Sequence, residues 1–300
     1  MKSIKNIPGS VRQRILDRAR KGRRPFNELL QYYAIERFLY RFSLSDHSDK
    51  FVLKGALMLR VWGSPGIRPT MNIDMLGITS NEESEIIKQI QDIFTVDVEP
   101  DGLVFDPDSI RSEKITEDAD YKGIRIRFHG NLDKAIIHMQ VDIGFGDAVH
   151  PGPEMHEFPT LLEFPAPFLN CYSLESSIAE KLEAMVKLGI LNSRMKDFYD
   201  IWLMARLFDF DKGSLTEAIR QTFKRRGTPI PLEIEAFSTS FIDAKQIQWT
   251  AFWKKLEQEY VPKNFKDVIL AVEEFLSPAI SSLFSKNPNP LKWKAPGPWK

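Results

Sequence analysis

The sequence has one cysteine, no net charge and no long hydrophobic run. The scarcity of cysteine and the lack of long apolar runs each exclude a class of protein. Cys171 alone cannot build a disulfide framework or a cysteine-rich zinc site, which favours a reducing, cytoplasmic environment. No apolar run approaches the roughly 18 residues that a membrane helix needs, so we expect no membrane partner. The basic N-terminal residues are not followed by an apolar segment, which argues against a secretory signal.

The residues that are present indicate a folded chain with an uneven charge distribution. Of its 300 residues, 43% are hydrophobic, enough for a substantial core and too many for global disorder. Residues 1–60 contain 14 Lys and Arg but 5 Asp and Glu, so the rest of the chain is acidic. A basic end suits a phosphate-rich partner. The charges of Arg12, Arg14, Arg18 and Arg20 are also consistent with a solvated helix face.

The hydrophobic pattern predicts helices at both ends of the chain and a sheet between them. We expect helices over residues 10–21, 26–42 and 83–94, then an acidic loop over 97–120, and strands in 51–62, 121–129 and 136–145. A proline-rich stretch from Pro151 to Pro167 is a candidate boundary, followed by helices to about residue 285. The predicted regions are a basic helical region (1–49), a core (50–165), a helical domain (166–285) and a Pro/Trp tail (286–300) whose tryptophans pack onto the body.

Two segments place acidic side chains where a divalent ion could bind. In RPTMNIDMLG, residues 68–77, Asn72 and Asp74 are two apart and share a face if the segment is a strand. Asp142, in VDIGFGD, lies on the polar face of another predicted strand. Oxygen ligands of this kind suit Mg²⁺, which phosphoryl and nucleotidyl transfer use to neutralise and align phosphates. An aspartate at a strand end is also a common turn or capping residue.

A predicted helix over residues 173–189 carries a lysine within its apolar stripe. Ser173 is a plausible N-cap and Gly189 a plausible end, and Lys181 falls among the apolar positions of the wheel. Such a lysine either extends its amine to solvent or binds an anion such as a triphosphate. In SRMKDFYDIW, residues 193–202, Asp197 and Asp200 lie one helical turn apart, and Arg194 could pair with Asp197.

Taken in order, five motifs resemble the abortive-infection nucleotidyltransferase toxins of the AbiEii type: LKGALMLRVWG, RPTMNIDMLG, VDIGFGD, LESSIAEKLEAMVKLG and NSRMKDFYDIW. The resemblance covers roughly residues 26–210. It implies an α+β fold, with a DNA polymerase β-like core containing a mixed sheet, N-terminal helices and a helical C-terminal domain. It also implies Mg²⁺- or Mn²⁺-dependent transfer from an NTP, in some members to the 3′ end of tRNA, which blocks translation. A repressor-type antitoxin and a part in phage defence follow from the same resemblance.

The resemblance also assigns roles by position. It makes Asn72, Asp74 and Asp142 the metal and catalytic positions, and Lys181 a catalytic and phosphate-binding residue. Asp200 is a catalytic candidate, and the substrate-binding candidates are Gly55, Thr70, Arg194 and Asp197. Gly55 would let the backbone approach phosphate, although Ala56 stands where the family pattern has a second Gly or Ser.

Asn72 departs from the family pattern, which has aspartate there. Asparagine has the same shape but no negative charge, so metal affinity should fall. Asn72 marks either a natural protein of weakened activity or an engineered substitution that spares the expression host. Two other functions remain open: a metal-dependent nuclease, and a non-catalytic protein that binds nucleic acid or a partner. Asn72 is the best support for the second.

Overall fold

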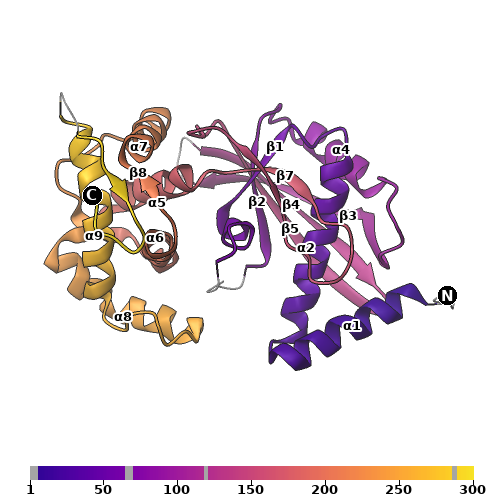
Figure 1. Cartoon of the computed structure of the whole chain (residues 1–300). Coiled ribbons are helices and arrows are strands. Elements are labelled where there is room, and N and C mark those ends of the chain that lie inside the picture. The colour runs from indigo at the N-terminus through magenta and orange to yellow at the C-terminus, as the bar shows by residue number, and fades with distance from the viewer. Residues whose placement is uncertain (1–5, 65–69, 118–120, 286–288) are drawn as a thin grey trace. The chain divides into compact units, whose positions relative to one another are not determined.

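The computed structural model describes residues 6–64, 70–117, 121–285 and 289–300 (Figure 1). The chain forms two compact units. The sheet unit comprises Met1–Gly146 and Glu154–Cys171, and the helical unit comprises Asp147–Pro153 and Tyr172–Lys300. Each unit is described by itself. The division of the chain at residues 49, 165 and 285 stays a prediction.

The sheet unit contains a seven-stranded mixed sheet, which confirms the predicted α+β class. Its strand order is β3-β4-β5-β2-β1-β7-β6. The pairs β2–β5 and β1–β7 are parallel and the other neighbours are antiparallel. The strands are β1 (Phe51–Lys54), β2 (Asn72–Gly77), β3 (Leu103–Glu117), β4 (Tyr121–Leu132), β5 (Ala135–Phe145), β6 (Glu154–Glu157) and β7 (Phe168–Cys171).

Two sequence predictions in this unit are wrong. The apolar run 51–62 is a strand only to Lys54, because Gly55 takes a φ of 74° and turns the chain into a 3-10 helix, η1 (Gly55–Leu57), and α3 (Met58–Val61). The predicted acidic loop at 97–120 contains β3. This strand pairs only with β4, at the edge of the sheet, where charged side chains reach solvent. Its register shifts between Asp106 and Arg111, around Pro107.

Three helices accompany the sheet: α1 (Ile7–Gly22), α2 (Phe26–Leu44) and α4 (Glu83–Phe94), all close to the predicted ranges. In Figure 1, α2 and α4 lie over one face of the sheet. Beneath them four aromatic rings form the centre of the core, and every pair of these rings has centroids 4.9–6.4 Å apart: Phe38, Phe94, Phe105 and Phe128. The core therefore occupies one face of the sheet, and the opposite face carries the polar residues of β2, β4 and β5.

The helical unit is mainly helical, as predicted, and its described residues form five longer helices. They are α5 (Leu174–Leu188), α6 (Met195–Leu207), α7 (Lys212–Arg226), α8 (Thr239–Leu256) and α9 (Phe265–Ser282), with short 3-10 helices η2 (Gly189–Leu191) and η3 (Glu235–Phe237). Ser173 caps α5 by accepting from the Ser176 N–H. No described helix is long and apolar enough to cross a membrane.

The C-terminal tail packs onto this unit, as predicted. Trp293 is 2% exposed, and its indole N–H donates to the Ala205 carbonyl at 2.6 Å. The Trp299 indole donates to the Phe275 carbonyl at 2.9 Å. The prolines of the tail predict no regular structure there, but the tail contains a short strand, β9 (Lys292–Trp293), which pairs with β8 (Phe210–Asp211).

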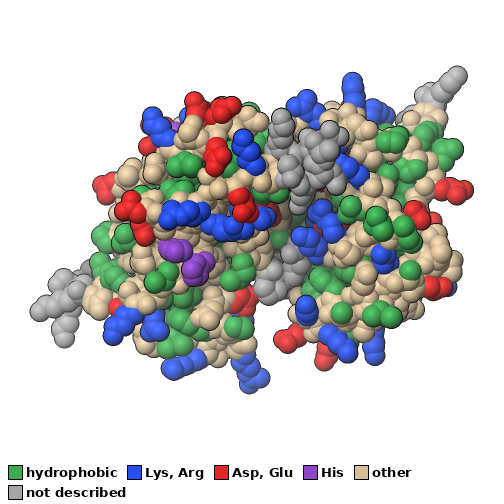
Figure 2. Space-filling view, turned by 180° about the vertical axis from the view of Figure 1, so that it is seen from behind, with side chains coloured by type: hydrophobic (Ala, Val, Ile, Leu, Met, Phe, Trp, Pro, Cys, Tyr) green, Lys and Arg blue, Asp and Glu red, His purple; other side chains and the backbone are tan. Residues whose placement is uncertain are grey.

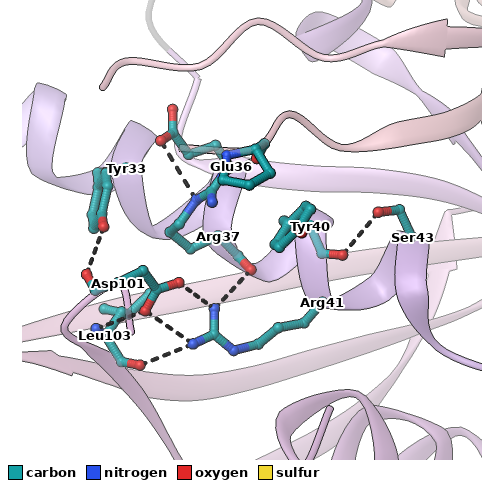
Figure 3. A network of polar contacts seen from close by, with 9 residues as sticks. Tyr33, Glu36, Arg37, Tyr40, Arg41, Ser43, Asp101 and Leu103 are labelled. Carbon is teal, nitrogen blue, oxygen red and sulfur yellow. Dashed lines mark hydrogen bonds and ion pairs between the residues drawn. The ribbon is translucent and has the colours of Figure 1, made fainter. Parts of the chain in front are cut away.

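A buried polar network on α2 joins this helix to the start of β3 (Figure 3). Arg41 donates to both carboxylate oxygens of Asp101, at 2.7 and 3.0 Å, and to the Leu103 carbonyl at 3.1 Å. The Tyr33 hydroxyl donates to the Asp101 carbonyl at 2.6 Å. Because the guanidinium and the carboxylate are both buried, this bidentate pair holds α2 in one position on the sheet.

The same helix buries a second carboxylate, Glu36, whose ion pair with Arg37 is longer than the ion pair between Arg41 and Asp101. Glu36 is 1% exposed, and it accepts a hydrogen bond from the Leu161 N–H at 2.5 Å. The nearest cation in the network, Arg37, lies 3.6 Å from its other oxygen. Burial raises the pKa of Glu36 to about 7, although the Leu161 hydrogen bond and Arg37 oppose the shift. The folded protein therefore holds a proton on Glu36 that the unfolded chain releases.

Stability is expected to fall as pH rises from about 4.5 to about 7, because over this range only the folded state keeps the Glu36 proton. The loss is about 3–4 kcal/mol, since each pKa unit corresponds to about 1.4 kcal/mol. Glu36→Gln should remove this dependence, raising the melting temperature at pH 8 but not at pH 5. Thermal melts at both pH values check this, with the exposed Glu85→Gln as control. An equal shift at both pH values would contradict it.

Candidate functional site

The structure brings the two predicted carboxylates of the sheet unit onto neighbouring strands. Asp74 on β2 is the register partner of Asp142 on β5, and Asn72 is the partner of Gln140. Ile73 and Met75 are buried, whereas Asn72 and Asp74 are partly exposed, so these two side chains share the polar face. The register therefore places three oxygen-bearing groups close together, as the spacing suggested.

Gly55 makes room for one of these carboxylates. A Cβ atom built on Gly55 would lie 2.1 Å from an oxygen of Asp74, so any side chain there would displace the carboxylate. The glycine follows Lys54, the register partner of Asp74 on β1. Thr70 makes a long hydrogen bond to β2, because its hydroxyl lies 3.5 Å from the Asn72 carbonyl. The first two residues of the RPTMNIDMLG motif lie outside the described residues.

Asp142 is held by an arginine that sequence analysis did not connect with it. Arg125 on β4 donates from Nε to one carboxylate oxygen at 2.7 Å and from Nη2 to the other at 3.0 Å. The hydrogen bond and the charge of Asp142 raise the pKa of Arg125 above its usual value, so the guanidinium stays charged. Gln140 donates to the same aspartate at 3.0 Å. Alternation along β4 predicts the polar face, but the partner depends on the β4–β5 register.

These contacts belong to a closed ring of five side chains across β3, β4 and β5. Glu113 accepts from Arg125 at 3.2 Å and from two nitrogens of Arg127 at 2.9 and 3.0 Å. Arg127 then donates from Nε to Gln140 at 3.2 Å, which closes the ring. The hydrogen bond from Arg127 lowers the pKa of Glu113, so the carboxylate stays ionised. The ring contains two positive and two negative groups and is electrically balanced.

A second polar feature lies on the same face of the sheet. His129 on β4 is the register partner of His138 on β5, and their rings meet edge to face with centroids 4.6 Å apart. Figure 2, which views the molecule from behind, shows basic, acidic and histidine side chains gathered on this side of the sheet unit. The face that carries Asp74 and Asp142 is therefore polar over several strands.

The donor set of the sheet unit fits a hard divalent ion. Asp74 and Asp142 supply carboxylate oxygens at paired positions, and the Asn72 amide supplies a neutral oxygen, which are ligands that Mg²⁺ accepts. Gly55 keeps the space beside Asp74 clear of a side chain. Within the described ranges, no group of three or more Asp, Glu, His or Cys is arranged to hold a metal. The sequence therefore offers two charged ligands and an amide.

The remaining candidates cluster in the helical unit, on α5 and α6. Lys181 donates to Asp200 at 2.8 Å and to Asp197 at 3.2 Å. These carboxylates are 2% and 1% exposed, and the Lys181 side chain is 16% exposed. Arg194 lies 2.7 Å from the second oxygen of Asp197, as its spacing of three residues suggested. Lys181 thus neutralises buried acids, and a phosphate contact by the same amine stays a prediction.

Cys171 has no nucleophilic character in this structure. It is 1% exposed, and burial raises the pKa of its thiol to about 12. The thiol therefore stays protonated at neutral pH.

Comparison with known proteins adds a family match and two similar folds. The sequence model described as "Nucleotidyl transferase AbiEii toxin, Type IV TA system" matches residues 37–271. A crystal structure of a proposed nucleotidyltransferase from H. pylori is 12% identical, covers 82% of this chain and 93% of its own, and has a TM-score of 0.47. JHP933 from Helicobacter pylori is 13% identical, with coverages of 83% and 92% and a TM-score of 0.46. A search of curated protein sequences finds no match.

Proposed function

Because the chain belongs to the AbiEii nucleotidyltransferase toxin family of type IV toxin–antitoxin systems, we propose that it moves a nucleotide from an NTP to an RNA acceptor. The proposed acceptor is the 3′ end of tRNA, whose modification would block translation in the cytoplasm. The observation that carries the proposal is the pairing of Asp74 with Asp142 across β2 and β5, with Gly55 beside Asp74. An antitoxin of the transcriptional-repressor type would be its partner and would restrain it, and phage defence would be its role.

Asp74, Asp142 and the Asn72 oxygen would hold Mg²⁺ or Mn²⁺. When bound, this ion neutralises phosphate charge and aligns the reacting groups. The chain's own contribution is preorganisation, since the β2–β5 register keeps both carboxylates on one face and Gly55 leaves room for Asp74. We further propose that the protein with Asn72 is nearly inactive, because one of three expected negative charges is missing.

Lys181, Arg194, Asp197, Asp200 and Thr70 are proposed to contribute to NTP binding or catalysis. Lys181 supplies a positive charge suited to phosphate, and its two carboxylate partners fix the position of the amine. A lysine that binds triphosphate would favour transfer over hydrolysis, which separates the proposal from a metal-dependent nuclease. The non-catalytic alternative is favoured by Asn72 and by the guanidinium that already occupies Asp142.

Product length distinguishes the three functions. The Asn72→Asp variant is incubated with tRNA, each labelled NTP, and either Mg²⁺ or a chelator. A transferase lengthens the RNA by labelled nucleotides, a nuclease shortens it, and a binding protein leaves it unchanged. Loss of labelling with the chelator would support the proposed metal dependence. The genomic neighbour offers an independent check, since a small repressor gene next to this one is expected.

The basic helix α1 is expected to bind the RNA backbone. Arg18 and Arg20 are exposed, whereas Arg12 and Arg14 lie over the rings of Phe26 and Phe164. Arg18→Gln/Arg20→Gln should weaken tRNA binding and reduce the slope of log affinity against log salt by about 1.4–1.8, since each lost phosphate contact accounts for about 0.7–0.9. Binding titrations between 50 and 200 mM salt, as rough limits, measure this.

The matched control is Lys254→Gln/Lys255→Gln, which removes two exposed charges from α8. It should leave the salt slope unchanged. If both double variants behave alike, the α1 charges form only a solvated helix face.

A further inference from the structure

Arg125 forms an ion pair with Asp142, which is a carboxylate that the proposed metal site needs. Its Nε and Nη2 atoms meet the two Asp142 oxygens at 2.7 and 3.0 Å, and the aspartate side chain is 17% exposed. Planar, bidentate pairs of this kind are the strongest hydrogen-bonded ion pairs in proteins. A divalent ion that bound Asp142 would place two further positive charges beside the guanidinium, and like charges at this distance repel.

The ring of five side chains gives Arg125 a second anionic partner. Glu113 accepts from its Nη1 at 3.2 Å, on the side away from Asp142's contacts with Nε and Nη2. Glu113 is exposed and lies on the edge strand β3. If an ion took over Asp142, Glu113 could keep the guanidinium near the site. The ring is neutral without the ion, so the ion's arrival leaves an excess of positive charge that favours an entering polyanion.

We propose that Arg125 competes with the divalent ion for Asp142 and, once displaced, binds the phosphates of the incoming NTP. The inference rests on the proposed function, because it takes Asp142 as a metal ligand. A guanidinium suits this exchange, since the same planar fork that binds a carboxylate also binds phosphate oxygens. Arg125 would then couple metal binding to NTP binding: the ion alone binds weakly, and the ion with its nucleotide binds well.

The coupling predicts opposite effects from one substitution. Arg125→Gln should raise the affinity for Mn²⁺ alone by about tenfold, because the competing cation is gone, and should lower the affinity for Mn²⁺ with a non-reactive NTP analogue by about tenfold, in line with the energy of a charged hydrogen bond. Arg125→Lys should restore part of both effects. Loss of a purely structural contact would weaken both affinities together or neither.

The experiment titrates Mn²⁺ into each variant with and without the NTP analogue, using electron paramagnetic resonance to count free ion. Each substitution is made in two parent proteins, the one with Asn72 and its Asn72→Asp variant. Arg111→Gln is the matched control, because Arg111 lies on the adjacent strand and its side chain contacts the Asp108 and Ile110 carbonyls. This substitution removes the same charge without touching Asp142. Both affinities should therefore stay within about twofold of the parent, because salt screens the effect of an exposed charge that does not contact the site. Thermal melts establish that each variant is folded.

The outcomes separate this inference from the proposed function. Opposite shifts in the two affinities support the inference. Mn²⁺ binding to the Asn72→Asp parent with no change in folded Arg125→Gln overturns the role of Arg125 and leaves the metal site standing. If neither the Asn72→Asp parent nor its Arg125→Gln variant binds Mn²⁺ with or without the analogue, the metal site and the inference both fail.

Discussion

Asn72→Asp is expected to raise the rate of nucleotide transfer by about 10²–10³, the usual scale for one electrostatic group acting on a transition state. The new carboxylate would join Asp74 on the same face of β2, two register positions from the Asp74–Asp142 pair. A third negative ligand should increase metal occupancy and improve the alignment of the reacting phosphate. Steady-state labelling of tRNA with each of the four NTPs measures the change.

The same substitution should turn a harmless protein into a growth inhibitor. Expression of both forms in a bacterial host, with and without the cognate antitoxin, tests this. Asn131→Asp is the matched control, because it makes the same chemical change on β4 and should leave growth and transfer unaltered. Equal growth, together with no transfer from any NTP by the Asn72→Asp variant, would refute the transferase proposal and leave the binding-protein alternative.

Lys181→Met is expected to abolish transfer and also to destabilise the helical unit by about 3–5 kcal/mol, the scale for breaking a buried ion pair. Sequence analysis left two roles open for this lysine, extending its amine to solvent or binding an anion, and it did not predict a buried ion pair. The structure changes that expectation, because Asp197 and Asp200 are almost fully buried and both accept from the amine. Denaturant unfolding and tRNA labelling in the Asn72→Asp background measure the two effects separately.

Two further variants separate the structural role of Lys181 from its role in transfer. Lys181→Arg keeps the charge and should stay folded. Lys181→Met/Asp200→Asn removes one charge of each sign and should regain most of the lost stability without regaining transfer. Transfer at the parental rate by a folded variant without a positive charge at position 181 would contradict a contact with phosphate.

Much of the fold could be predicted because its signals are local. The helix from Glu83 to Phe94 and the capped helix between Ser173 and Gly189 follow from periodicity and capping residues. Alternation identified the polar face of the strand that carries Asp142. By contrast, β3 was missed because its charged residues look like a loop until the neighbouring strand supplies its pairing partner. The run from Phe51 to Trp62 was misassigned because its composition does not reveal the turn at Gly55.

The candidate site was predictable only in part, since its contacts depend on register. Spacing placed Asn72 and Asp74 on one face, but their alignment with β5 is a parallel pairing between distant segments. The partnership of Arg125 with Asp142 depends on the β4–β5 hairpin register, which a shift of one residue would destroy. Alternation along β4 shows that Arg125 faces the polar side, but it does not identify the carboxylate opposite.

The route of the chain through the sheet has a consequence for synthesis on the ribosome. β7 completes one side of the sheet by pairing Cys171 with Leu53 of β1, and the chain enters the helical unit at residues 147–153 before it returns for β6 and β7. A nascent chain that ends before residue 168 therefore lacks β7, the strand that links β6 to the rest of the sheet, and one that ends before residue 161 also lacks the Leu161 N–H that Glu36 accepts from. The strands that carry Asp74 and Asp142 emerge early, but β6 and β7 at one edge of the sheet are added late. Pairing between such distant segments is slow to form, so a truncated or stalled chain remains an incomplete toxin.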